Sequence, residues 1–249
     1  MGVARERADA GSFLPVWVRH EHAARYEFAA RFVAGKNVVD CACGDGTGSA
    51  TFARAGATMV HALDASKEAV AHAADVFAAP NIDFKHGDAT ALPFPDKMAD
   101  VYISLETIEH IPQDADYLRE AVRVLKPEGV FICSTPNRDV TNPGTSLANK
   151  PWNPFHVREY NSVEFDALLR QYFGEIEMFG QNPRSTLRVG CVQLFGRLMP
   201  FHGAVRFNQF CKLPRLLFDK LQHHRVMSNK DAACFEYYVA VCKNPLRSF

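Results

Sequence analysis

One stretch of this chain constrains its fold more than any other: an apolar run, a glycine-rich turn, and a second apolar run that ends on a carboxylate. Residues 38–48 read VVDCACGDGTG, and sixteen residues after this stretch Asp64 closes the run MVHALD. The pattern predicts a strand at 37–41, a helix at 46–55 and a strand at 59–63, which together begin a parallel βαβ unit. Glycines at such a turn let the backbone approach a ligand closely, and a carboxylate at the next strand tip can accept hydrogen bonds from a ribose. We therefore expect a nucleoside-containing cofactor at the carboxyl ends of parallel strands.

The charges and glycines of this turn discriminate between two classes of cofactor. Dinucleotide-binding turns read G-x-G-x-x-G, whereas Gly44, Gly46 and Gly48 follow a G-x-G-x-G pattern and Ser49 stands where the third glycine of the fingerprint belongs. Asp40, at the end of the first strand, would repel a pyrophosphate and would attract a cationic amino or sulfonium group. The electrostatics favour S-adenosylmethionine (SAM) over NAD.

Four successive segments resemble the motifs of class I SAM-dependent methyltransferases. VVDCACGDGTG resembles their first motif and ALDAS their second-strand motif; HGDATALPFPDKMADVYISLETIEHI resembles the next two, and RVLKPEGVFICSTPNR the fifth-strand motif. The similarity covers roughly residues 20–180 in the usual order, which is more specific than a single glycine loop. It implies an α/β fold: a Rossmann-like, doubly wound, seven-stranded sheet, mainly parallel with the last strand antiparallel, and here with an inserted helical cap.

The resemblance also implies which residues contact SAM. They follow the ends of the first four strands: Asp40, Ala42, Gly44 and Gly46 around the methionine moiety, Asp64 at the ribose, Ala65, Asp88 and Ala89 at the adenine, and Leu105 near the sulfonium. Asp88 has a second interpretation, because Gly87-Asp88 is also favourable turn chemistry. In a predicted helix before the first strand, Arg25 or Tyr26 could contact the SAM carboxylate or the acceptor, and a plain surface helix is an equal alternative.

A candidate metal site follows the fourth strand. In ETIEHI, Glu106, Glu109 and His110 would share one face of a helix, and two carboxylates with an imidazole can form half of a metal site. A helix surface and a general-base pair are the alternatives. STPNRDVTN (134–142) and NPFHVREY (153–160) add a resemblance to metal-dependent O-methyltransferases of ubiquinone biosynthesis and to small-RNA 2′-O-methyltransferases, in which a later histidine can supply a fourth ligand.

His156 matches that later histidine, and a loop histidine bonded to backbone is its alternative interpretation. The expected metal ligands are therefore Glu106, Glu109, His110 and His156, for Mg²⁺ or Mn²⁺. A divalent ion would lower the pKa of an acceptor hydroxyl. The expected catalytic residues are Glu106, His110 and His156, and one of the histidines would take the proton if the ion is absent or loosely bound. The chain lacks the richer histidine pattern of the RNA enzymes, so no nucleic acid partner is expected.

The function predicted from these motifs is methyl transfer from SAM to a hydroxyl of a small polyol, a sugar or sugar-bearing natural product or glycan precursor. This acceptor class is implied by the overall match to bacterial methyltransferases that carry STPNR and NPFHVREY. Two alternatives stay open: a metal-independent N-methyltransferase acting on an amino sugar or another small amine, and a SAM-binding scaffold without catalysis.

Composition and the order of segments limit the expected partners, location and domain layout. The 249 residues carry 28 basic and 28 acidic side chains, which gives no sign of an obligatory polyanionic partner, and the 7 cysteines are expected to be reduced thiols. We expect no signal peptide or membrane span and a cytoplasmic location. The predicted organisation is a helical cap at 1–35, a SAM-binding domain at 36–180 and 234–249, and a helical insertion at 181–233. The insertion, with basic residues among apolar ones, is interpreted as a substrate cap, a homodimer or packing face, or a peripheral lipid contact.

Overall fold

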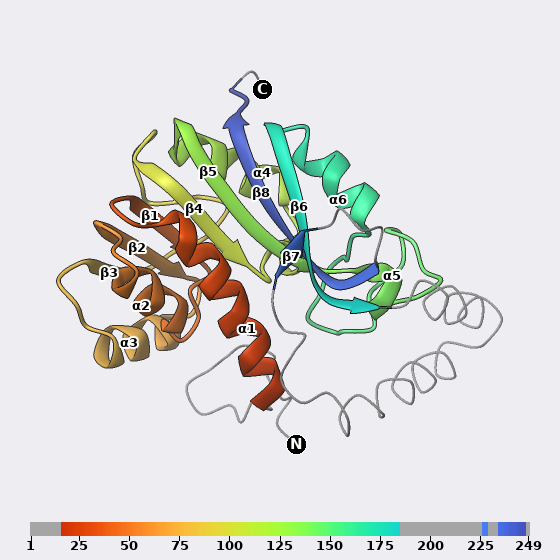
Figure 1. Ribbon diagram of the computed structural model, residues 1–249, viewed down its shortest axis with the longest axis horizontal. Coiled ribbons are helices and arrows are strands. Elements are labelled where there is room, and N and C mark those ends of the chain that lie inside the picture. The colour runs from red at the N-terminus through yellow and green to blue at the C-terminus, as the bar shows by residue number, and fades with distance from the viewer. Residues whose placement is uncertain (1–15, 185–225, 229–233, 248–249) are drawn as a thin grey trace.

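A computed structural model describes residues 16–184, 226–228 and 234–247 of the chain. Their centre is one twisted sheet with the strand order β3-β2-β1-β4-β5-β8-β6-β7 (Figure 1). Strands β1 to β5 run parallel, and β8 runs antiparallel to both β5 and β6. The strands are β1 (Asn37–Cys41), β2 (Met59–Asp64), β3 (Ile82–His86), β4 (Ala99–Leu105), β5 (Leu125–Pro136), β6 (Phe173–Arg184), the two-residue β7 (Met227–Ser228) and β8 (Cys234–Pro245).

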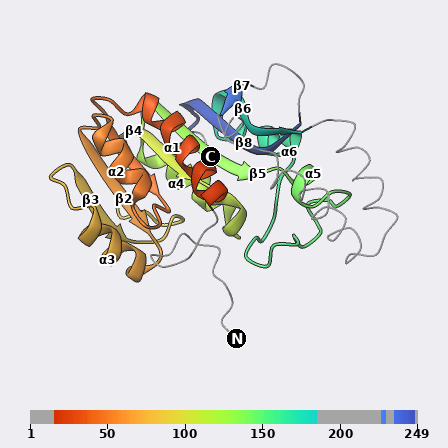
Figure 2. The same ribbon diagram turned by 60° about the horizontal axis from the view of Figure 1, so that its bottom comes forward.

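Helices cover both faces of this sheet. The described helices are α1 (Val16–Ala29), α2 (Thr47–Arg54), α3 (Lys67–Val76), α4 (Asp114–Val124), α5 (Arg138–Thr141) and α6 (Ser162–Leu169), with short 3₁₀ turns η1 (Ala30–Phe32) and η2 (Ile108–His110). Figure 2 shows α1 crossing one face beside α2, and Phe28 and Phe52 from these two helices belong to one buried cluster. Tyr117 of α4 and Phe165 of α6 belong to a second cluster. Both faces of the sheet are therefore packed, as in doubly wound α/β folds.

Strand β1 lies in the middle of the sheet and packs its apolar residues against both faces. Val38 packs in the α1–α2 cluster, whereas Val39 and Cys41 pack in the α4–α6 cluster. All three side chains are fully buried, because successive residues of a strand point to opposite faces. The predicted α/β architecture, mainly parallel with an antiparallel strand near one edge, is confirmed.

Two local predictions need correction. The segment ETIEHI is not a regular helix: Glu106 has a left-handed φ of 52°, and only Ile108–His110 form a 3₁₀ turn. Residues 181–184, expected to open the helical insertion, belong instead to β6, which continues to Arg184, where it pairs with Cys234. The remainder of the expected insertion, 185–225, and residues 229–233 lie outside the described residues, as do residues 1–15 of the expected N-terminal cap.

Among the helices that the structure describes, none combines the length and the hydropathy that crossing a bilayer would require.

Candidate functional site

The turn from β1 to α2 is shaped by three residues in the left-handed region. Ala42, Gly44 and Gly46 have φ values of 62°, 55° and 85°. A side chain at Gly46 would meet the helix behind it, since a Cβ there would lie 2.7 Å from the Cβ of Ala73, whereas a Cβ at Gly44 would meet nothing within 4 Å. Gly46 therefore lets the turn pack against α3, and the backbone at Gly44 borders open space.

Helix α1 lies on the same turn. A Cβ added to Gly48 would come within 2.6 Å of the Tyr26 ring, so this glycine makes room for the tyrosine. Tyr26 is also packed edge-on against Phe52, with ring centroids 6.2 Å apart. Burial, and then the charge of Asp40, raises the pKa of the Tyr26 hydroxyl. Tyr26 is therefore a neutral cover over the start of α2.

Asp40 lies inside the turn. Its side chain is buried, and the Ser49 hydroxyl donates to Asp40 Oδ2 at 2.5 Å. Burial raises the pKa of Asp40 to about 7, and the nearby charge of Asp64 acts in the same direction. A carboxylate that lacks a compensating charge favours an incoming cation.

Asp64 joins the end of β2 to the glycine turn. Its Oδ2 accepts a hydrogen bond from the Gly44 backbone N–H at 3.0 Å, and its Oδ1 accepts one from the Ser66 N–H at 2.8 Å. The side chain is 7% exposed. Because a carboxylate has about four acceptor positions, two remain for a ligand after these two bonds. Asp64 can therefore hold the turn and still accept from a diol.

The remaining predicted cofactor residues line the same edge of the sheet. Ala65 follows Asp64 and is exposed, and Ala89 and Leu105 are partly buried against the two core clusters. Asp88 is exposed, and its Oδ1 accepts from both the backbone N–H and the hydroxyl of Thr90, at 2.8 Å each. These bonds lower the pKa of Asp88. The turn interpretation of Asp88 is thus present in the structure, and it leaves the second carboxylate oxygen for another role.

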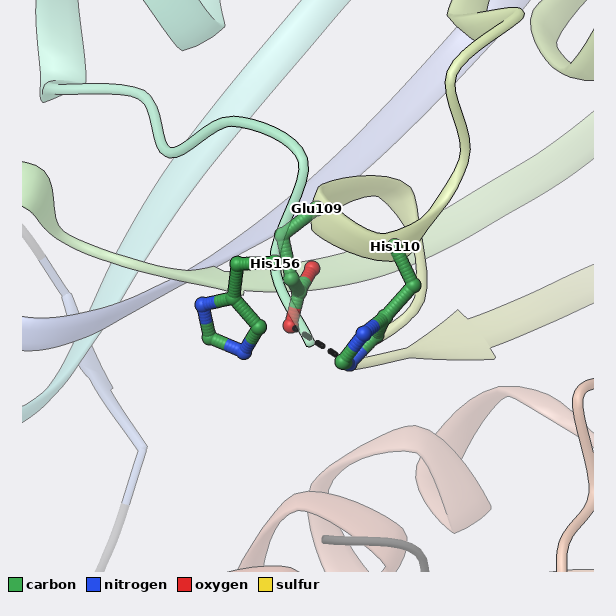
Figure 3. Close-up of side chains that lie close together, drawn as sticks. All are labelled: Glu109, His110 and His156. Atoms are coloured by element: carbon green, nitrogen blue, oxygen red, sulfur yellow. Dashed lines mark ion pairs between the residues drawn. The ribbon is translucent and has the colours of Figure 1, made fainter. Parts of the chain in front are cut away.

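A second polar group gathers at the end of β4. One ligand atom each from Glu109, His110 and His156 lies within 4.8 Å of the other two, although His156 comes from a loop that follows β5. In Figure 3 the two imidazoles lie on either side of the Glu109 carboxylate. Glu109 is buried and accepts from the Thr135 hydroxyl at 3.2 Å. Burial, and then the charge of Glu106, raises its pKa well above the usual range.

Glu106 stands outside this three-residue group. Its Oε1 accepts from the Ser134 hydroxyl at 2.6 Å, and its backbone N–H donates to the same hydroxyl at 3.0 Å. Its Oε2 lies 4.0 Å from the guanidinium of Arg25. The left-handed backbone at Glu106 breaks the helical spacing that would have placed it beside Glu109 and His110. The structure brings together three of the four expected ligands.

Arg25 reaches the site from α1. Its guanidinium is 1% exposed, donates to Gln181 Oε1 at 2.5 Å and lies 4.7 Å from the centre of the Tyr237 ring. The sequence predicts Arg25 as one of two possible contacts of the SAM carboxylate or the acceptor, but it does not predict Gln181 or Tyr237. No motif signalled those two, because β6 and β8 supply them from beyond the recognised region.

Glu159 is a further residue that sequence reasoning missed. It is 2% exposed, and its Oε1 lies 2.5 Å from His156 Nδ1. Its position three residues after the histidine, in FHVREY, was the available signal.

Comparison with known proteins agrees with this geometry. Residues 39–133 match a family model described as a methyltransferase domain. The chain is 38% identical over 161 residues to a protein named a probable S-adenosylmethionine-dependent methyltransferase from Mycolicibacterium smegmatis, covering 65% of this chain and 60% of that protein. It is 35% identical over 153 residues to one of the same description from Mycobacterium tuberculosis, covering 61% and 53%. The chain is therefore similar to SAM-dependent methyltransferases over these ranges.

Solved structures match a larger share of this chain than the curated relatives do. A SAM-dependent methyltransferase from Thermotoga maritima matches with a TM-score of 0.62 at 14% identity, covering 92% of each chain. The [4+2]-cyclase SpnF matches with a TM-score of 0.58 at 18% identity, covering 91% of this chain and 82% of that one. At such identities the likeness shows a Rossmann-like methyltransferase fold alone, and a cyclase among the matches illustrates that one fold hosts several reactions. The chain spans a little over half the length of the curated relatives above.

Proposed function

We propose that this chain is a SAM-dependent methyltransferase that transfers a methyl group to a hydroxyl of a small polyol, such as a sugar or a sugar-bearing natural product. The observation that carries the proposal is the bond between Gly44 N–H and Asp64 Oδ2. It brings a glycine turn and a diol-accepting carboxylate together at the carboxyl edge of parallel strands, where α/β folds bind nucleoside cofactors.

The residues of the turn fit SAM. Asp64 keeps two acceptor positions for the ribose hydroxyls. Gly44 borders open space, which suits a methionine moiety. Asp40, with a pKa raised to about 7 by burial, would gain from a nearby amino or sulfonium charge. Ala65, Ala89 and Leu105 would contribute apolar contacts to the adenine and the sulfonium side.

Glu109, His110 and His156 fit a divalent ion. Two imidazoles and one buried carboxylate form a donor set that suits Mn²⁺ or another transition ion better than Mg²⁺, which prefers oxygen ligands. Burial, and then the charge of Glu106, raises the pKa of Glu109, and a bound cation would favour its charged form. When bound, the ion would make an acceptor hydroxyl more acidic. If the ion were absent or loosely bound, His110 or His156 would hold the released proton, and Glu106, 15% exposed beside Arg25, would face the acceptor.

The names of relatives favour oxygen as the acceptor atom. The chain is 38% identical over 107 residues to a ubiquinone biosynthesis O-methyltransferase of Ruegeria pomeroyi, covering 43% of each protein. A fatty-acid O-methyltransferase of Mycolicibacterium smegmatis is 28% identical over 164 residues. Both names refer to oxygen methylation. A sugar or polyol acceptor rests on the resemblance of the STPNR and NPFHVREY segments.

The test is methyl transfer from SAM to matched panels of sugars, other diols and amines, with and without a chelator. We expect S-adenosylhomocysteine to form with hydroxyl acceptors, to stop on chelation and to return with Mn²⁺. Binding of SAM, measured by calorimetry, should be unaffected by the chelator. Methylation of amines that ignores the chelator would contradict the proposal.

A further inference from the structure

We propose that Glu159 is a positioning residue: it fixes the protonated ring nitrogen of His156, so that the other nitrogen offers its lone pair to the group formed with Glu109 and His110. The inference rests on the proposed function, in which His156 binds an ion or receives a proton. It adds a role for a buried carboxylate that contacts neither the cofactor turn nor an acceptor.

The contact between Glu159 and His156 identifies the ring nitrogen that carries the proton. Nδ1 of His156 lies 2.5 Å from Oε1 of Glu159, and the two side chains are 8% and 2% exposed. An ionised carboxylate only accepts hydrogen bonds. Nδ1 therefore carries a proton and donates it.

The contact with Asn153 identifies the other ring nitrogen as the one with the lone pair. The Asn153 Oδ1 accepts from the Phe155 backbone N–H at 3.0 Å, which orients the amide. Its Nδ2 then lies 2.9 Å from Nε2 of His156 and donates to it. Nε2 is therefore an acceptor with a lone pair, and the ring is the neutral Nδ1–H tautomer. An ion that binds Nε2 takes the place of the amide donor.

Figure 3 agrees with this assignment, because one ring nitrogen of His156 points toward the Glu109 and His110 side chains and the other points away. His110 is fixed in the same manner. Its Nδ1 lies 3.0 Å from the Phe155 carbonyl, which can only accept, so Nε2, 4.0 Å from Glu109 Oε1, carries the lone pair. Metal-binding histidines generally have their second nitrogen held by a carboxylate or carbonyl in this way.

Glu159 is itself held in place from the far side. Its Oε2 accepts from the Asn142 amide at 2.5 Å and from the Thr141 hydroxyl, both at the end of α5. Its backbone carbonyl accepts from Arg138 at 3.2 Å. Both oxygens of a buried carboxylate are thereby committed, one to the scaffold and one to His156. A side chain held in this way sets an orientation, and at 2% exposure it is shielded from an acceptor.

The test is made on the full chain with two readouts. Nitrogen-15 NMR of the imidazoles reports the tautomer of His156, and titration with Mn²⁺ reports metal affinity. In the wild-type protein we expect a proton on Nδ1. In Glu159→Ala we expect that signature to be lost and Mn²⁺ affinity to fall about 10- to 100-fold. Glu159→Gln keeps an acceptor oxygen, so it should retain the tautomer and lose less affinity.

Glu164→Gln is the matched control. Glu164 pairs with Arg138 in the same scaffold, at 2.5 Å, and does not contact His156. The control should leave the tautomer and the Mn²⁺ affinity unchanged. An unchanged tautomer in Glu159→Ala, or an equal loss of affinity in Glu164→Gln, would overturn the inference. If the wild-type protein bound no Mn²⁺, the metal proposal would fail, and the tautomer would still decide the role of Glu159.

Discussion

The glycine turn at residues 40–48 and the group formed by Glu109, His110 and His156 are built on different principles. The turn is local: its shape comes from three left-handed residues within five positions, and Asp64 closes it from the next strand. The second group joins η2 to a loop more than forty residues later, and its orientation depends on contacts such as the one from His156 to Glu159. A local site tolerates change in remote loops, whereas an assembled site depends on each of its supports.

The largest effect should come from the assembled site. Glu109→Gln removes the buried carboxylate charge while keeping its shape, and we expect methyl transfer to fall at least about 100-fold with SAM affinity unchanged. The partner variant is Glu106→Gln, which makes the same change outside the three-residue group. Calorimetric titration with Mn²⁺ should show binding lost in the first variant and kept in the second. The reverse result would return Glu106 to the metal site.

Asp64 offers the strongest test of the local site. Asp64→Ala removes the proposed acceptor of the ribose hydroxyls and the tie to Gly44. Because a hydrogen bond to a charged group contributes about 1.5–3 kcal/mol, SAM binding should weaken about 10- to 100-fold by calorimetry. Asp83→Ala, on the neighbouring strand β3, is the control and should bind SAM normally. Equal affinities in all three proteins would remove Asp64 from the cofactor site.

The burial of Asp40 predicts a pH dependence of stability. Its pKa of about 7 in the folded protein exceeds the ordinary value of 3.8, so between these values the folded chain holds a proton that the unfolded chain has released. Its stabilising contribution is complete below about pH 4 and is lost as the pH rises through about 7.

Relative to Asp40→Asn, the free energy of unfolding of the wild-type protein should therefore fall across this window by at most about 1.4 kcal/mol per pH unit. Urea denaturation without SAM at a series of pH values measures the difference. The exposed Asp88, whose pKa is lowered, provides an opposite case: Asp88→Asn should remove stability that the wild type gains as the pH rises. If the free energy of unfolding changed with pH in the same way in the wild-type protein and in Asp40→Asn, the pKa of Asp40 would not be raised in the folded protein.

The smallest effect is expected at Ala42. Its φ of 62° places an alanine in the left-handed region, which costs about 1 kcal/mol for a residue with a Cβ. Glycine relieves this strain but loses more entropy on folding. Ala42→Gly should raise the free energy of unfolding by less than about 1 kcal/mol, measured by urea denaturation. A destabilised variant would indicate that the Ala42 methyl group makes a packing contact worth more than the strain.

The same contrast explains how much the sequence could predict. Two apolar runs with glycines between them predicted β1 and β2 nearly to the residue, because these consecutive strands are also neighbours in the sheet. The helical face expected for ETIEHI failed because spacing carries no information on the left-handed backbone at Glu106. Gln181 and Tyr237 could not be found, since their proximity to Arg25 arises only when β6 and β8 pair. Glu159 lay in a recognised segment, three residues after His156, but outside a helix this spacing alone does not show that the two side chains form a hydrogen bond.

The packing of Tyr26 on Gly48 has a practical consequence for anyone who trims this chain. The family model matches residues 39–133, so an expression fragment cut to this range would retain the glycine turn and lose the aromatic ring that covers the start of α2. Such a fragment would expose the glycine turn on the side that Tyr26 covers, and it would also lack Arg25. A fragment that keeps these contacts must therefore include α1 and β8, and it is longer than the range that the family model matches.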